Sequence, residues 1–242
     1  MFTHSPQASL KRVFDVAAAL ALSALTAPLL LAAVALVRFS SRGPVIYSQT
    51  RMGRGRRPFT IYKVRTMHHD CERHTGPRWC TENDPRVFPV GHLLRRTHLD
   101  ELPQLWNVLR GEMSLVGPRP ERPEFVTQLE KAVPRYADRL DVLPGVTGLA
   151  QVNLPPDTDL DSVRRKLVFD LHYVGQATLW YDVRIIFGTG LYLLGVPRGT
   201  TARLLGLCAG QGGVRDARPR ASEASAGREM VGQALPAWRG ES

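Results

Sequence analysis

A long apolar run near the N-terminus, residues 16–37, restricts the possible folds of this chain more than any other part of it. Only Ser23, Thr26 and Pro28 interrupt the run. A helix of about 20 apolar residues crosses the hydrocarbon core of a bilayer, so the run is long enough to span a membrane. It is too long for the apolar part of a signal peptide, and no small-residue cleavage pattern ends it. The sequence therefore predicts a membrane-bound protein.

Basic residues flank the apolar run on both sides. Lys11 and Arg12 precede it, and four arginines follow it, namely Arg38, Arg42, Arg51 and Arg54. The positive-inside rule keeps such flanks in the cytoplasm, and a single crossing cannot do so for both. Pro28 lies near the middle, where its missing N–H and its ring would kink a helix and nearby hydroxyls can bond freed carbonyls. We predict a re-entrant helix over residues 10–38; a kinked single-pass helix is the alternative.

The chain is strongly basic, with a formal net charge of +10 over 242 residues. Such a charge suits anionic lipid headgroups, nucleic acid or diphosphate substrates. The sequence has no basic stripe interleaved with aromatic residues, no finger spacing of Cys and His, and no recognisable nucleic-acid motif. We therefore expect a phospholipid membrane and no nucleic acid as partner, and an anchored nucleic-acid-binding protein is the alternative.

Two adjacent carboxylates, Asp100 and Glu101, precede a predicted helix. Apolar residues follow them at helical spacing: Leu102, Leu105, Trp106 and Leu109. Gly111 lies where such a helix would stop. At the amino end of a helix, the dipole and the free backbone N–H groups favour an ionised carboxylate and a bound phosphate. The pattern predicts a phosphate-handling site.

An ionised Asp100 is a competent nucleophile, and Glu101 beside it could hold a magnesium ion. Magnesium prefers hard oxygen ligands and usually shares its shell with substrate phosphates. The simpler alternative is that Asp100 only caps the helix and Glu101 is a first-turn charge.

Basic residues surround this pair in the sequence. A hairpin is predicted from strands at 45–49 and 59–64 with a polar turn at 52–58. Lys63 and Arg65 are two residues apart, so they share a strand face and could meet a phosphate. A solvated basic edge strand is the alternative.

Two more arginines are candidates for binding a diphosphate, because guanidinium groups match its oxygens in pairs. A short helix or turn over 90–97 brings Arg95 just ahead of Asp100. Arg119 lies between two prolines that hold the backbone extended. The alternative for either is a surface ion pair with a glutamate such as Glu121.

The cysteines do not predict a metal site or a disulfide framework. Cys71 and His74 are spaced like a pair of zinc ligands, and Cys80 follows them. The sequence has no second closely spaced pair of ligands, so a zinc site is disfavoured. Together with Cys208, these cysteines fit free thiols in a reducing cytoplasm.

The C-terminal half offers fewer signals. Residues 144–152 form a glycine-punctuated loop entering a short strand or extended segment, without the glycine pattern of a nucleotide-binding loop. Residues 160–173 are predicted to be helical. Residues 179–196 predict an amphipathic helix in the headgroup region, with a buried core helix as the alternative. From 197 onward the composition predicts a disordered basic tail.

The stretch LDELPQLWNVLRGEMSLVGPRP at 99–120 resembles the signature of the bacterial sugar transferases, the monotopic phosphoglycosyl transferases. The resemblance extends through KRVFD at 11–15, GPVIYSQ at 43–49, KVRTM at 63–67 and PGVTGLAQV at 144–152, and covers roughly residues 10–195. The sequence departs from the family at 153–159, where NLPPDTD replaces a turn of the Gly-Arg type.

The resemblance implies a monotopic, mainly helical α+β protein of the bacterial inner membrane. Residues 10–38 would form the re-entrant helix, 39–196 the catalytic domain at the cytoplasmic face, and 197–242 the tail. Members of the family transfer a sugar-1-phosphate from a UDP-sugar to polyprenyl (undecaprenyl) phosphate with an Asp-Glu dyad and magnesium, which gives UMP and a polyprenyl-diphosphate-sugar for exopolysaccharide or other glycoconjugate assembly. The resemblance also matches Lys63 to a motif position of the family and places Arg95 where a substrate-binding arginine is expected. A non-catalytic scaffold of the same fold is the alternative.

Overall fold

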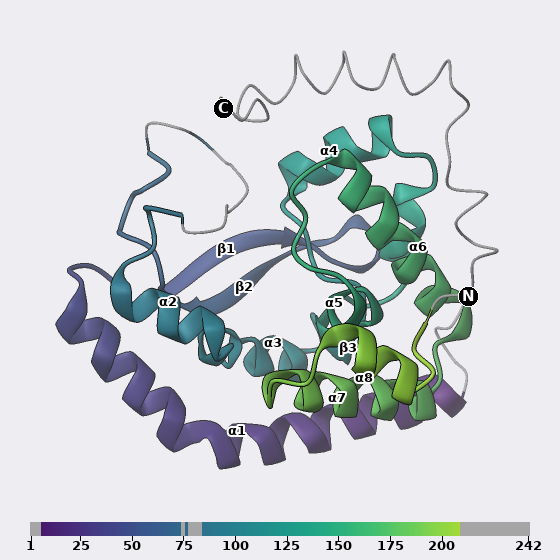
Figure 1. Cartoon of the computed structure of the whole chain (residues 1–242), viewed down its shortest axis with the longest axis horizontal. Coiled ribbons are helices and arrows are strands. Elements are labelled where there is room, and N and C mark those ends of the chain that lie inside the picture. Colours follow the sequence, from purple (N-terminus) through teal and green to yellow (C-terminus); the bar gives the residue numbers. More distant parts are fainter. Residues whose placement is uncertain (1–5, 74–75, 77–83, 209–242) are drawn as a thin grey trace. The chain divides into compact units, whose positions relative to one another are not determined.

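The computed structural model describes residues 6–73, 76 and 84–208 (Figure 1). The chain divides into two compact units. Unit 1 comprises Met1–Arg51 and Phe59–Leu115, and unit 2 comprises Met52–Pro58 and Val116–Ser242. The described part is mainly helical, with two small two-stranded sheets, which agrees with the predicted α+β class.

Unit 1 begins with one long helix, α1 (Pro6–Ser40), which continues through Pro28. A narrow stripe of α1 is buried: Asp15, Ala19, Ala33 and Val37. The rest of its surface exposes large apolar side chains, including Leu20, Leu25, Leu29, Leu31 and Phe39. By length and composition α1 could cross a membrane, as the sequence predicted. Pro28 has no N–H, so the carbonyl of Ala24, four residues earlier, lacks its helical donor. The Thr26 hydroxyl does not replace this donor, because it donates to the Leu22 carbonyl.

The predicted hairpin is confirmed. Strands β1 (Ile46–Met52) and β2 (Pro58–Val64) pair, and a short 3-10 turn, η1 (Arg54–Arg56), connects them. Gly55 in this turn has a φ of 62°, a left-handed conformation that glycine adopts without steric cost. The inner side of β2 contributes Val64 to a core shared with α1 and the next helix.

The segment around the two carboxylates folds as a 3-10 turn followed by a separate short helix, and not as one helix. Helix α2 (Pro89–Arg96) forms where a short helix was predicted. The 3-10 turn η2 (Leu99–Glu101) carries both carboxylates, and α3 (Gln104–Arg110) follows after Pro103. Gly111 ends α3 in a left-handed conformation with a φ of 80°, as predicted. Leu105 is buried, whereas Trp106 is 58% exposed.

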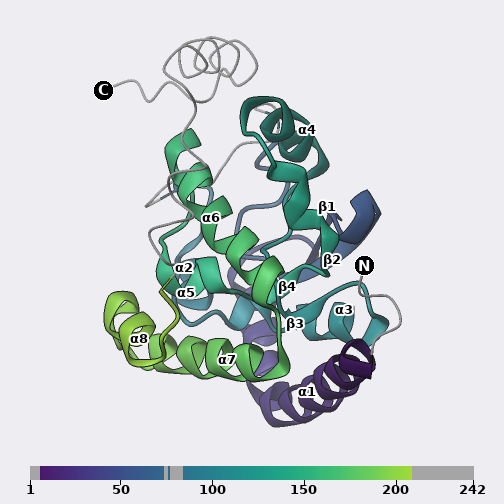
Figure 2. The same cartoon turned by 90° about the vertical axis from the view of Figure 1, so that its right-hand side faces the viewer.

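The second two-stranded sheet consists of β3 (Ser114–Val116) and β4 (Gly145–Thr147), and the remaining elements of unit 2 are helical (Figure 2). They are α4 (Pro123–Ala132), η3 (Tyr136–Asp141), α5 (Leu149–Asn153), α6 (Leu160–Gln176), α7 (Leu179–Leu193) and α8 (Arg198–Leu204). The two predicted helices over 160–173 and within 179–196 are thus confirmed.

Two expectations for unit 2 were wrong, one of them only in part. The segment 144–152 contains the predicted short strand, β4, but residues 149–153 are helical, because Leu149, Ala150 and Val152 pack into the core. Residues 198–204, predicted as the start of a disordered tail, form α8, which packs against α7 where Gly188 leaves room for Leu205 and Leu207. Residues 209–242 of the predicted tail lie outside the described part of the chain.

Candidate functional site

The acidic pair lies in the turn η2 of unit 1 and is largely buried. Asp100 is 7% exposed and Glu101 is 9% exposed. His98 begins the turn with a φ of 55°, a left-handed conformation that a residue with a side chain adopts at some cost. The chain therefore accepts local backbone strain immediately before two carboxylates that it partly withdraws from water.

Lys63 of β2 meets this pair. Its ammonium lies 2.8 Å from Oε1 of Glu101, so the structure brings together one predicted cation and one predicted acid. The ammonium partly neutralises the negative charge that two adjacent carboxylates concentrate in the turn.

Asn107 fixes β2 in the register that this ion pair needs. Its side-chain oxygen accepts the Tyr62 N–H at 3.3 Å, and its amide group donates to the Thr60 carbonyl at 2.7 Å and to Glu112 at 2.8 Å. The side chain thus acts as a neighbouring strand for the residues just before Lys63. Asn107 was not predicted as a site residue, although the family-like string at 99–120 contains it.

The start of α1 also holds the helix that follows the acidic turn. The Arg12 guanidinium donates to the carbonyls of Val108 and Leu109 at 2.6 and 2.8 Å, which are among the last carbonyls of α3. Asp15 accepts the Leu115 N–H at 3.2 Å. A cation at a helix C-terminus is favourable because it pairs with orphan carbonyls and with the helix dipole. These contacts explain why the KRVFD motif accompanies the acidic motif.

The other predicted cations of unit 1 contact the chain itself. The Arg95 Nε donates to the Thr66 hydroxyl at 2.8 Å, which orients this side chain from the last turn of α2. Arg65 is buried, and its guanidinium donates to the Pro44 carbonyl at 2.5 Å and to the Ser41 carbonyl at 2.9 Å. Burial lowers the pKa of Arg65. Arg65 thereby ties the segment after α1 to the end of β2, and its role in substrate binding stays a prediction.

The acidic turn fits a magnesium ion by the chemistry of its donors. Asp100 and Glu101 offer carboxylate oxygens, and magnesium commonly takes one or two carboxylates and completes its shell with phosphate and water. Among the described residues, no group of three or more His, Cys, Asp or Glu side chains could hold a metal ion without further ligands. Cys71 is a free thiol whose pKa burial raises, while His74 and Cys80 lie outside the described residues.

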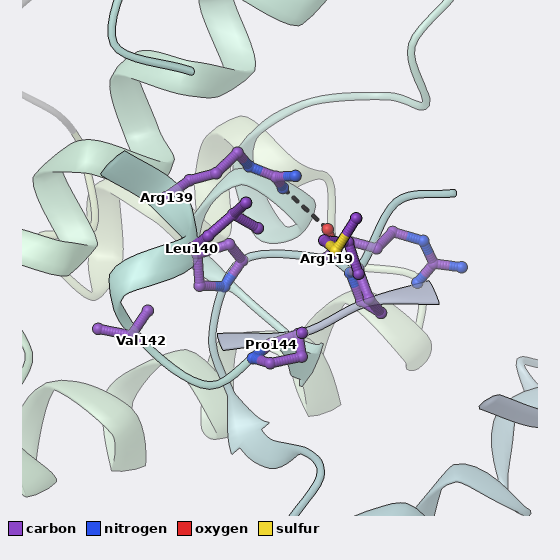
Figure 3. A pocket seen from close by; sticks show the side chains of 9 residues that line it. Arg119, Arg139, Leu140, Val142 and Pro144 are labelled. Atoms are coloured by element: carbon purple, nitrogen blue, oxygen red, sulfur yellow. Dashed lines mark hydrogen bonds between the residues drawn. The ribbon is translucent and has the colours of Figure 1, made fainter. Parts of the chain in front are cut away.

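Arg119, the last predicted site residue, lies in unit 2 on a tightly held segment (Figure 3). The Pro118 carbonyl accepts the Gly145 N–H at 3.0 Å, and the Arg119 carbonyl accepts from Arg139 at 2.8 Å. The cavity beside these residues has a volume of about 10 Å³, room for roughly one water.

A buried ionic network supports this segment. Arg139 pairs with Asp170 at 2.8 Å, and Lys166 pairs with Glu121 at 2.8 Å and with Asp157 at 2.6 Å. Burial alone would lower the pKa of Lys166, but the two carboxylates outweigh it and the net shift is upward. Asp157 belongs to the stretch where the chain departs from the family pattern, so the departure supplies a partner to Lys166.

Comparison with known proteins identifies the family. Residues 6–195 match the family model described as "Bacterial sugar transferase". A protein of Aeromonas hydrophila named UDP-N-acetylgalactosamine-undecaprenyl-phosphate N-acetylgalactosaminephosphotransferase is 43% identical over 182 residues, 75% of this chain and 43% of that protein. A UDP-glucose:undecaprenyl-phosphate glucose-1-phosphate transferase of Caulobacter vibrioides is 46% identical over 183 residues, 74% of this chain and 67% of that protein.

A third relative, the "Exopolysaccharide production protein PSS" of Rhizobium leguminosarum, is 42% identical over 185 residues, which cover 74% of this chain and 92% of that protein. The matched region thus spans less than half of the Aeromonas relative and nearly all of the Rhizobium one. Because the family model covers most of the sequence, including the acidic turn, this chain belongs to the bacterial sugar transferase family.

Proposed function

We propose that this protein transfers a sugar-1-phosphate from a UDP-sugar to polyprenyl phosphate, releasing UMP and leaving a polyprenyl-diphosphate-sugar. The observation that carries the proposal is the buried acidic turn, in which Asp100 adjoins a glutamate paired with Lys63 at 2.8 Å. Relatives named for undecaprenyl-phosphate sugar-phosphate transfer support the same reaction class. The product would serve as the first membrane intermediate of exopolysaccharide or other glycoconjugate assembly.

In the first half-reaction a carboxylate oxygen of Asp100 attacks the phosphorus that bears the sugar. The bond between that phosphorus and the bridging oxygen breaks, and UMP leaves with the electron pair. In the second half-reaction an oxygen of polyprenyl phosphate attacks the same phosphorus, and the Asp100 carboxylate leaves. Neither step requires a proton transfer. The covalent intermediate allows a water-soluble donor and a membrane-bound acceptor to use one small site in turn.

The remaining predicted site residues would bind charged groups. Glu101 would hold a magnesium ion, which when bound neutralises charge on the diphosphate. Lys63 limits the charge of the acidic turn, and Arg95 and Arg119 would bind phosphate oxygens of the donor. The Thr66 hydroxyl restricts the Arg95 side chain, and the contact with Arg139 holds the backbone of Arg119, which lowers the entropy lost on binding.

The protein would work at the cytoplasmic face of the bacterial inner membrane. The exposed apolar side chains of α1 support insertion into lipid, because so large a surface is rarely left in water. Basic residues at both ends of α1 and Pro28 within it support a re-entrant path. Exposed Trp180 and Phe187 support an interfacial position for α7.

The decisive test uses the full chain, a panel of UDP-sugars and magnesium, without acceptor lipid. We expect a single turnover of UMP and, by intact mass, one phosphosugar adduct that maps to Asp100. Asp100→Asn should release no UMP, whereas Asp141→Asn, which removes an exposed carboxylate, should behave as wild type.

Adding polyprenyl phosphate should discharge the adduct and permit further turnovers. UMP release by Asp100→Asn at the wild-type rate would reassign the nucleophile. Absence of transfer from every UDP-sugar tested would favour the non-catalytic scaffold.

A further inference from the structure

Unit 2 has a surface groove between α7 and the end of α8. These two helices lie next to each other in Figure 2. The volume of the groove is about 550 Å³, and its walls come from two stretches of chain. Helix α7 contributes Trp180, Val183, Arg184 and Phe187, and the α8 end contributes Arg203, Leu204, Leu205 and Gly206. Small-molecule sites commonly have such a volume and a mostly apolar lining with few polar groups.

The α7 wall belongs to a continuous apolar face. Trp180, Val183 and Phe187 are spaced three and four residues apart, so they project from one side of the helix. Trp180 is 70% exposed and Phe187 is 58% exposed. The opposite side of α7 is fully engaged in the unit, since Tyr181, Asp182 and Ile185 are buried. The exposed side is therefore not a packing face of unit 2 in the described residues.

The groove is also positively charged. Arg184 donates to the Leu205 carbonyl and lies over the Tyr181 ring, which fixes its guanidinium at the groove wall. Arg203 is exposed, and among the described residues no acidic side chain is recorded as its partner. None of the side chains lining the groove in that part of the chain is acidic. An occupant must therefore combine an anionic group with an apolar body.

We propose that this groove binds one anionic phospholipid, with the phosphate between Arg184 and Arg203 and the upper part of an acyl chain against Trp180, Phe187 and Leu204. A nucleic acid would match the arginines but would leave the apolar wall in water. A zwitterionic lipid would cover the wall, but the ammonium of its own headgroup would offset the charge of its phosphate, so the net charge of the groove would stay uncompensated. The groove thereby fixes the rotation of α7 about its axis at the bilayer surface, and this role rests on the membrane location in the proposed function.

The test follows Trp180 fluorescence in the full chain, with Trp79, Trp106 and Trp238 replaced by Phe and with helical content checked by circular dichroism. The detergent-solubilised protein is titrated with phosphatidylglycerol or phosphatidylcholine that carries bromine on its acyl chains. We expect saturable quenching at a lipid fraction about tenfold lower for phosphatidylglycerol, because a charged contact is added to the apolar one. Arg203→Gln should remove most of this preference, and Arg165→Gln, an exposed charge on α6, should keep it.

Native mass spectrometry of the unsubstituted chain from mixed micelles provides a second measurement, in which bound phosphatidylglycerol should exceed phosphatidylcholine. Equal quenching by both lipids, unchanged in Arg203→Gln, would overturn the headgroup site. Quenching that appears only after removal of residues 209–242 would identify that segment as the occupant and would also overturn the proposal. Neither measurement needs the UDP-sugar donor or the polyprenyl phosphate acceptor. Failure of the transferase assay would therefore not affect the test of the lipid site.

Discussion

Lys63 and Glu101 lie 38 residues apart in the sequence and meet at 2.8 Å in the acidic turn. The sequence indicated Glu101 through its place before a predicted helix and Lys63 through its place on a predicted strand, but neither spacing nor composition could indicate that they pair. The pairing depends on where β2 lies relative to η2, and the Asn107 side chain sets that position by bonding Thr60 and Tyr62. Long-range contacts of this kind are a property of packing and leave no local pattern.

Lys63→Met should lower kcat/KM for the donor about 100-fold, because one partner of a largely desolvated charge pair is lost. The magnesium concentration for half-maximal rate should not rise, since removing a cation from the turn does not weaken the binding of another. Lys63→Arg should recover part of the activity. The control Lys131→Met, at an exposed residue of α4, should leave kcat/KM for the donor unchanged. Steady-state kinetics at varied magnesium checks this. Wild-type kinetics in Lys63→Met would remove Lys63 from the site.

At the scale of elements, local signals were sufficient where they were strong. Turn residues predicted the hairpin, and Gly111 predicted the end of α3. Periodic apolar residues predicted α6 and α7. Signals failed for α5 and α8, whose helices have five and seven residues. Helices that short are unstable alone, so burial against neighbours decides them. In α8 the buried residues are Thr201 and Ala202, whose small size and weak hydrophobicity resemble the composition of a disordered segment.

The contact between α1 and α3 couples the long apolar helix to the segment that follows the acidic turn. Arg12→Gln should lower the free energy of unfolding by about 1–2 kcal/mol, because two charge-assisted hydrogen bonds at the C-terminus of α3 are lost. It should also lower kcat with little change in KM. Thermal unfolding in detergent and steady-state kinetics measure the two effects.

Arg12→Lys distinguishes capping from membrane topology. Lysine keeps the positive charge before α1 but cannot reproduce the fork that reaches both Val108 and Leu109. We expect Lys to restore only part of the stability and of kcat. Full recovery would mean that Arg12 acts only as a cytoplasmic charge.

The N-terminus of α6 depends on pH through its capping residue. Asp159 accepts the Ser162 N–H at 2.6 Å, and this backbone hydrogen bond is the main reason why the pKa of Asp159 lies below its usual value. The stabilisation is therefore fully present above the unfolded pKa of about 3.9 and is lost as pH falls through the lower folded pKa. The advantage of wild type over Asp159→Asn in denaturant unfolding should shrink below about pH 4. A difference that stays constant down to pH 2 would contradict it.

At the scale of the whole molecule, α1 decides where the protein can work. Its buried stripe of Asp15, Ala19, Ala33 and Val37 includes residues on both sides of Pro28, so both halves of the helix pack within unit 1. Both ends of α1 carry basic residues, Arg12 near the start and Arg38 near the end. A straight crossing would place one of these ends, and the protein packed against it, outside the cytoplasm.

Single-cysteine variants test the re-entrant path directly. With the native cysteines replaced by serine, Ser9→Cys and Ser40→Cys place thiols in the first turn and at the end of α1, and Leu25→Cys places one on its exposed apolar face. In intact cells an impermeant maleimide should label none of them, and in inverted membrane vesicles it should label positions 9 and 40. Leu25→Cys should stay unlabelled in both, because lipid covers it. Labelling of position 9 from the outside of intact cells would show that α1 crosses the membrane once. The proposed re-entrant path, in which α1 returns to the cytoplasm after Pro28, would then be wrong.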